Sequence, residues 1–107
     1  MTVYDKLSAN GISLVKADIE SLVSKYNIKE ISIFGSSIRD DFNDNSDIDL
    51  LIEFKNSENI SLFDILDIQD YFCKLTNRKI DIVEPAGLKN PYRRESILRT
   101  KEILYVA

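Results

Sequence analysis

The strongest constraint on the fold of this chain is the alternation of acidic and apolar residues in the segment that begins at Asp47 and ends at Phe54. A period of two is typical of a β-strand, in which residues i and i+2 point to the same face. Asp47 and Asp49 are therefore expected on one face, and Ile48 and Leu50 on the other. Two carboxylates on one strand face repel each other unless a cation lies nearby, and Mg²⁺ prefers oxygen ligands. The pair is a candidate Mg²⁺ site, and the solvated face of an edge strand is the alternative.

A glycine-serine pair, Gly35-Ser36, ends the preceding apolar run and is separated from Asp47 by ten residues. Ser36 stands where a helix N-cap is expected, so residues 37–42 are expected to form a short helix or turn. The backbone N–H groups at such a turn can bind a phosphate. A phosphate-binding turn followed by metal-binding carboxylates suggests nucleotide chemistry.

A third carboxylate, Asp81, lies in another alternating run at 79–83. Ile80 and Ile82 share one face of this expected strand, and Asp81 lies on the other. If the strand neighbours the one that begins at Asp47, three carboxylates converge on one patch, as two-metal nucleotidyl transfer requires. The alternative is an ordinary exposed strand residue, and the sequence leaves this choice open.

Basic residues near these carboxylates are candidate phosphate ligands. Arg39 follows the glycine-serine pair closely enough to reach a triphosphate, and guanidinium donors match phosphate oxygens. A surface ion pair with Asp40 or Asp44 is an equally compatible role for Arg39. A small basic cluster further along the chain, either a solvated face or a phosphate contact, comprises Lys89, Arg93 and Arg94.

The order of the expected elements is typical of an α+β fold in a single domain over residues 1–107. We expect a small mixed β-sheet flanked by helices, with the helices on one face. The first two strands are too close in sequence for a crossover connection, which favours antiparallel or mixed pairing. Ser61 and Asp64 predict a capping box at the start of the longest helix. The expected helices span 2–9, 13–26, 61–76 and 91–100, and the expected strands span 30–34, 47–54, 79–83 and 103–106.

Composition narrows the possible chemistry. The chain has no histidine, which excludes Ser-His-Asp and Cys-His sites and histidine-ligated zinc built from this chain alone. The formal net charge of −4 argues against direct nucleic-acid binding through a simple basic surface. No apolar run is long enough to span a membrane, and the N-terminus lacks a signal-peptide pattern. The single cysteine, Cys73, fits a cytoplasmic protein and is expected to be an inert core thiol.

The combination of Gly35-Ser36, ten residues and Asp47-Ile48-Asp49 resembles the Gly-Ser…Asp-x-Asp signature of the polymerase-β-like nucleotidyltransferase superfamily. The surrounding residues 34–54, together with the run that contains Asp81, are similar to the minimal nucleotidyltransferases (MNT domains). This resemblance implies a mixed sheet flanked by helices. It also implies that Asp47, Asp49 and Asp81 hold two Mg²⁺ ions, with Asp81 placed to accept the proton of the attacking hydroxyl.

The same resemblance implies that ATP binds with Gly35 and Ser36 against its phosphates, with Arg39 as a further candidate ligand. It implies transfer of AMP to a tyrosine of a HEPN-type ribonuclease toxin, so that the protein acts as the antitoxin in a hetero-oligomer. The short length of the chain also favours an acceptor presented by a partner. Two alternatives are an antitoxin that neutralises by binding alone and a nucleotidyltransferase that acts on RNA or a small molecule. The sequence departs from many relatives at Ser37, where a basic residue is common, and at Asp40, where glycine is common.

Overall fold

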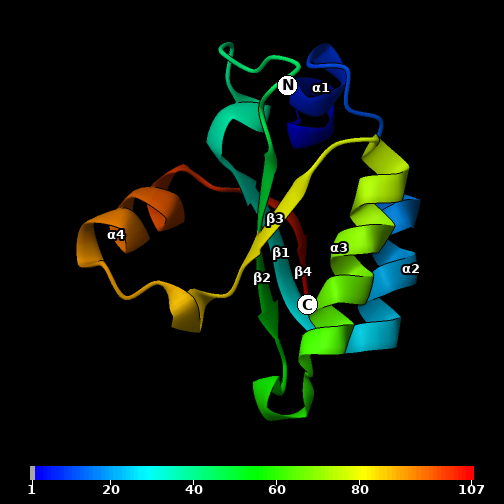
Figure 1. The fold of residues 1–107 in the computed structure, drawn as a ribbon, viewed down its shortest axis with the longest axis vertical. Coiled ribbons are helices and arrows are strands. Elements are labelled where there is room, and N and C mark those ends of the chain that lie inside the picture. The colour runs from blue at the N-terminus through cyan, green and yellow to red at the C-terminus, as the bar shows by residue number, and fades with distance from the viewer. Residues whose placement is uncertain (1) are drawn as a thin grey trace.

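A four-stranded β-sheet with the strand order β3-β2-β1-β4 forms the centre of the protein (Figure 1). The computed structural model describes residues 2–107. The strands are β1 (Ile28–Phe34), β2 (Ile48–Phe54), β3 (Ile80–Val83) and β4 (Glu102–Val106). The helices are α1 (Val3–Ala9), α2 (Lys16–Tyr26), α3 (Leu62–Thr76) and α4 (Pro91–Thr100). Three short 3₁₀ turns are η1 (Gly35–Ile38), η2 (Ser57–Asn59) and η3 (Pro85–Gly87).

The sheet is mixed. Strand β1 pairs antiparallel with both β2 and β4, whereas β2 pairs parallel with β3. Helix α3 connects β2 to β3, because a parallel pair needs a crossover connection rather than a tight turn. The prediction of a small mixed sheet in an α+β fold is confirmed, including the antiparallel pairing of the first two strands.

The two faces of the sheet pack against different helices. The main core contains Ile48, Leu50 and Ile52 of β2 together with apolar residues of α1, α2 and α3. A second, smaller cluster on the opposite face contains Leu51 of β2 and Ile97 of α4. Figure 1 shows α4 on one side of the sheet and α2 and α3 on the other.

The prediction that the helices lie on one face of the sheet is therefore wrong. The physical reason is the consecutive pair Leu50-Leu51, which interrupts the strict alternation of β2. Neighbouring residues of a strand point to opposite faces, so this pair places one leucine side chain on each face. Leu51 is 2 % exposed, and its contacts with Phe34, Leu88 and Ile97 provide an apolar surface against which α4 packs.

The ends of the helices follow local hydrogen-bonding rules. The Ser61 hydroxyl accepts a hydrogen bond from the Asp64 N–H at 3.2 Å, and the Asp64 carboxylate accepts one from the Ser61 N–H at 3.0 Å. This reciprocal capping box confirms the predicted start of α3. Helix α2 begins at Lys16 rather than at residue 13, because the Asp18 carboxylate accepts a hydrogen bond from the Val15 N–H and fixes the first turn there.

Cys73 is exposed, so its assignment as a core thiol is wrong. The buried stripe of α3 comprises Ile68 and Phe72. Cys73 is one residue beyond Phe72, and one residue corresponds to about 100° around a helix. This rotation places the thiol outside the stripe. Across residues 2–107, the helices are too short or too polar to cross a membrane.

Candidate functional site

The parallel pairing of β2 and β3 places Asp49 directly opposite Asp81. Paired residues of neighbouring strands point to the same face of a sheet, so the two side chains share a face. This is the face covered by α4, because Leu51, two residues beyond Asp49, packs against Ile97. Asp49 is half-buried and Asp81 is exposed. The sequence predicted a shared acidic patch only if these two strands are neighbours, and β2 and β3 are neighbours.

Gly35 provides the space that the Asp49 carboxylate occupies. Phe34 at the end of β1 pairs with Asp49, so Gly35 begins the turn beside this carboxylate. A Cβ atom added to Gly35 would lie 2.4 Å from Asp49 Oδ2, and the residue has a φ of 80°. Both the left-handed backbone and the close approach require glycine here.

The turn after β1 is shorter than predicted. It is the 3₁₀ turn Gly35–Ile38, with Phe34 rather than Ser36 at the N-cap position, so the predicted cap is wrong. Of the short helix or turn expected over 37–42, no helix forms, and the 3₁₀ turn begins two residues earlier and ends at Ile38. The Asn10 side-chain amide, at the end of α1, donates hydrogen bonds to the backbone oxygens of Ser37 and Arg39 at 2.7 and 3.1 Å. These contacts attach the turn to the end of α1.

Asp47 lies directly before β2 rather than within it, and its side chain is half-buried. The charges of the other two aspartates act on Asp49. Burial first, and then the charges of Asp81 and Asp47, raise the pKa of Asp49 above its usual value. The positive charges of Arg93 and Arg39 act in the opposite direction. The structure thus pairs Asp49 with Asp81, and Asp47 directly precedes β2; these three residues are called the acidic cluster below, and the charges of Arg93 and Arg39 act on Asp49.

Arg39 is engaged with an aspartate that the sequence did not suggest as its partner. Its Nε atom donates a hydrogen bond to Asp41 Oδ1 at 3.0 Å, and neither Asp40 nor Asp44 forms an ion pair with it in the described structure. This contact, and to a smaller degree Asp49, raises the pKa of Arg39 further above its usual value. Arg39 is exposed, so its guanidinium faces solvent beside the turn.

The basic cluster of the sequence separates into different roles in the structure. Arg94 Nη1 donates a hydrogen bond to the Pro85 backbone oxygen at 2.9 Å and ties the start of α4 to η3. Arg93 lies one helical turn before the buried Ile97, on the side of α4 that faces the sheet. It is the member of this cluster whose charge acts on Asp49.

Two residues that support this region, Asn10 and Arg78, carry no functional signal in the sequence. Arg78 donates hydrogen bonds to the backbone oxygens of Asn43 and Ser46, in the loop that leads into Asp47. No local signal predicts such contacts, because they join residues that are distant in sequence.

The donor set of the acidic cluster fits a hard divalent cation, since it consists of carboxylate oxygens whose mutual repulsion a cation would relieve. Across the part of the chain that the structure describes, no three acidic or cysteine side chains are close enough to complete a metal site by themselves. The aspartates would therefore need oxygen ligands from a substrate or from water to complete the coordination of Mg²⁺, which commonly retains several waters.

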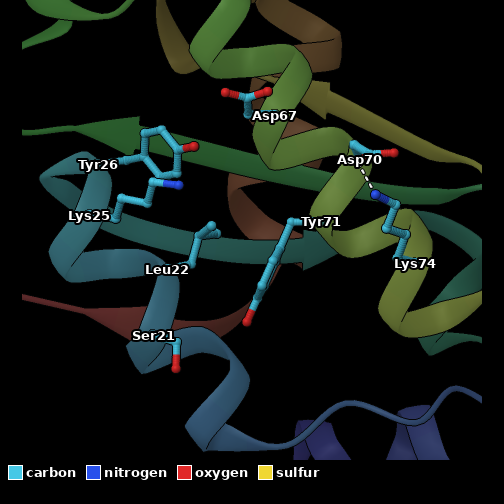
Figure 2. A pocket seen from close by; sticks show the side chains of 8 residues that line it. All are labelled: Ser21, Leu22, Lys25, Tyr26, Asp67, Asp70, Tyr71 and Lys74. Atoms are coloured by element: carbon cyan, nitrogen blue, oxygen red, sulfur yellow. Dashed lines mark ion pairs between the residues drawn. The ribbon is translucent and has the colours of Figure 1, made fainter.

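A separate groove of about 360 Å³ lies between α2 and α3 (Figure 2). Lys74 pairs with Asp70 at 2.9 Å along one wall, and the Lys25 ammonium lies 5.3 Å from the centre of the Tyr26 ring along the other. Helices α2 and α3 pack on the face of the sheet opposite Asp49. This groove contains none of the predicted site residues and is not part of the acidic site.

Comparison with known sequences gives a consistent result. Residues 15–104 match the profile of the family described as "Nucleotidyltransferase domain". The provisionally named protein adenylyltransferase MJ0128 of Methanocaldococcus jannaschii is 38% identical over 85 residues, which cover 79% of this chain and 83% of that protein. The protein adenylyltransferase MntA of Thermococcus cleftensis is 30% identical over 94 residues, which cover 88% of this chain and 90% of that protein.

Two solved structures share the fold. One, provisionally assigned as a minimal nucleotidyltransferase, superposes with a TM-score of 0.68 at 29% identity and covers 94% of both chains. The other, a toxin–antitoxin structure with AMP-PNP, has a TM-score of 0.68 at 16% identity and covers 88% of this chain and 75% of that chain. At that identity, the second comparison concerns the fold alone.

Proposed function

The chain belongs to the nucleotidyltransferase domain family, and on this basis we propose that it transfers AMP from ATP to a tyrosine hydroxyl of a partner toxin of the HEPN ribonuclease type. The modified toxin is thereby neutralised, so the protein acts as an antitoxin. The protein and its toxin form a hetero-oligomer in this proposal.

The observation that carries the proposal is the juxtaposition of Asp49 and Asp81 beside Gly35. A transferred phosphoryl group needs positive charge around it, and a cluster of carboxylates is the usual means by which a protein recruits that charge as Mg²⁺. Asp47, Asp49 and Asp81 would hold the Mg²⁺ ions, with two ions expected. Bound Mg²⁺ supplies neutralisation of the phosphate charges and activation of the attacking oxygen.

The reaction requires one bond to form and one to break. The acceptor hydroxyl oxygen attacks the α-phosphorus of ATP, the bond between that phosphorus and the oxygen bridging to the β-phosphate breaks, and pyrophosphate leaves. The proton of the hydroxyl passes to a carboxylate, and Asp81 is suited to accept it because it is exposed at the edge strand β3.

The remaining site residues would position the nucleotide. Gly35 and Ser36 would lie against the phosphates, next to the Asp49 carboxylate that occupies the space left by the missing Cβ of Gly35. Arg39 and Arg93, whose charges act on Asp49, would add positive charge for the phosphates.

The choice of a protein acceptor rests on relatives. MntA of Thermococcus cleftensis and MJ0128 are named as protein adenylyltransferases, and each covers more than three quarters of this chain. The toxin–antitoxin structure with AMP-PNP shares the fold of this chain. The names of these relatives favour a protein acceptor and ATP over RNA or a small molecule, and the shared fold is compatible with a toxin as that protein.

The direct test combines the purified protein with its partner toxin, MgCl₂ and α-labelled ATP. Label on the toxin tyrosine is the expected result, and D49N and D81N should each abolish it. D67N is the matched control, because Asp67 is an exposed aspartate of α3 on the opposite face of the sheet. Neutralisation of the toxin by D49N at the wild-type level would favour the binding-only alternative, and label on RNA in place of the toxin would contradict the protein acceptor.

A further inference from the structure

We propose that Arg78 is a positioning residue that fixes the loop before Asp47 and thereby sets the affinity of the acidic cluster for a divalent cation. The inference rests on the proposed function, because its premise is a cation site formed by Asp47, Asp49 and Asp81. It adds a residue to that site from outside the family signature.

The Arg78 guanidinium makes three contacts with one loop. It donates hydrogen bonds from Nη2 to the backbone oxygens of Asn43 and Ser46, the latter at 2.7 Å. It also lies over the ring of Phe42, 4.3 Å from the ring centre, which is close enough for a cation–π interaction. The side chain is half-buried, so these contacts are partly shielded from water.

The loop itself is closed by short-range hydrogen bonds. The Asn45 N–H donates to the Asn43 side chain at 2.8 Å, and the Ser46 N–H donates to the Asn43 backbone oxygen at 3.0 Å. These bonds shape the loop but do not attach it to the rest of the fold. Arg78 provides that attachment together with Phe42, which packs against the main core, and the Arg78 bond to Ser46 is made at the residue directly before Asp47.

The segment that leads into β3 contacts the chain on both sides of Asp47. Arg78 lies three residues before Asp81, and the Ile48 N–H donates to the Lys79 backbone oxygen at 2.9 Å. Asp47 is thus held from both sides, by Ser46 bound to Arg78 and by Ile48 bound to Lys79. This restraint opposes the electrostatic repulsion between Asp47 and Asp49.

A lysine could not provide the same restraint. The planar guanidinium stacks on an aromatic ring while its N–H groups bond to oxygens at its edge, whereas an ammonium is a compact charge on a flexible stem. R78K should therefore retain the charge and much of the stem packing. It should lose the simultaneous stacking on the Phe42 ring and hydrogen bonding to the loop oxygens. This makes R78K the variant that separates geometry from charge.

The experiment measures Mn²⁺ binding to the full chain by electron paramagnetic resonance in the presence of AMP-PNP, with thermal unfolding recorded in parallel. The set comprises wild type, R78A, R78K, D47N, the double variant R78A/D47N, and R99A as a control arginine on α4. We expect R78A to weaken Mn²⁺ binding by about 10- to 100-fold, the range for groups that orient metal ligands. R78K should be intermediate, R99A should match wild type, and R78A should add less than twofold to D47N.

The inference is overturned if folded R78A or R78K binds Mn²⁺ as wild type does, or if the effects of R78A and D47N multiply, because residues acting through one another are not additive. If R78A does not fold, R78K alone decides the outcome. If D47N, D49N and D81N all bind Mn²⁺ as wild type does, the cation site of the proposed function fails, which is a result distinct from failure of the role of Arg78.

Discussion

Asp49 and Asp81 face each other across the parallel pair β2–β3, and the carboxylate of Asp49 fills the space that a Cβ on Gly35 would need. This relationship joins three separated parts of the sequence at one point of the sheet. It also has an energetic cost, because two like charges on neighbouring strands repel each other. The consequences of that repulsion can be measured on the free protein.

Removing one of the paired charges should stabilise the fold while it abolishes activity. Cross-strand pairs contribute roughly 0.2–1 kcal/mol, so D49N and D81N should each raise the free energy of unfolding by an amount in this range. Urea unfolding at low ionic strength in EDTA measures the change, and added salt should reduce it. D67N, far from the cluster, should leave stability unchanged. A loss of stability in both D49N and D81N would contradict the repulsion.

The stability of the protein should also depend on pH through Asp49. Its pKa is raised in the folded state above the usual 3.8, so the folded protein holds this proton more tightly than the unfolded chain. The stabilisation is fully present below pH 3.8 and is lost as the pH rises through the raised pKa. Asp5, Glu30 and Asp41 have lowered pKa values and contribute in the opposite direction. The pH dependence of the wild-type stability is therefore the sum of these opposing contributions.

The difference between wild type and D49N isolates the contribution of Asp49. Thermal unfolding from pH 3.5 to 7 without divalent cations should show wild type losing stability relative to D49N as the pH rises. Saturating Mg²⁺ should reverse this trend, because a bound cation favours the charged carboxylate. A difference curve that is flat over this range would show that the Asp49 pKa is not raised.

Gly35 should not tolerate a side chain, for two separable reasons. Its φ of 80° costs a residue with a Cβ about 1–2 kcal/mol, and the Cβ would lie 2.4 Å from Asp49 Oδ2. Gly11 is the matched control, because its φ of 75° is similar but nothing lies within 4 Å of its Cβ position. G11A should therefore lose stability only and retain activity. G35A should lose more stability than G11A and also lose AMP transfer.

The double variant G35A/D49A separates the two effects at Gly35. Without the Asp49 carboxylate the steric conflict disappears, so the double variant should regain the stability that G35A loses beyond G11A. Chemical denaturation of the four proteins provides the measurement. Equal losses in G35A and G11A would show that the Asp49 carboxylate can move away without cost.

Local rules account for most of the secondary structure. The Ser61 capping box and the alternation through Asp49 concern residues a few positions apart, so the start of α3 and the identity of β2 could be predicted from sequence. The pairing of β2 with β3 could not be predicted from the sequence, because strand order depends on how α3 crosses the sheet. The second layer formed by α4 is not predicted by the alternation, because it depends on a few apolar residues that face away from the main core, among them Leu51 and Phe34.

The contacts that hold the acidic cluster in place were beyond sequence reasoning. Arg78 bonds to Ser46 across 32 residues, and Asn10 bonds to Ser37 across 27 residues. Such pairs leave no periodic pattern, because each involves one side chain and a backbone oxygen that every residue possesses. The carboxylates were recognisable because their chemistry is unusual in a strand, whereas their supports are ordinary polar residues.

Arg93 should contribute to nucleotide binding in a way that Arg99, on the same helix, does not. Arg93 lies one turn before Ile97 on the sheet-facing side of α4, and its charge lowers the pKa of Asp49 against the effects of burial and of Asp81. A hydrogen bond to a charged group contributes about 1.5–3 kcal/mol, and solvent exposure favours the lower end of this range. R93A should therefore raise the KM for ATP by about tenfold, with a much smaller change in kcat, because a triphosphate is bound equally before and during transfer.

R99A should leave both constants unchanged. An equal effect of the two variants would show that α4 attracts ATP only through its overall positive charge, and a fall in kcat without a change in KM would place Arg93 in the transfer step itself.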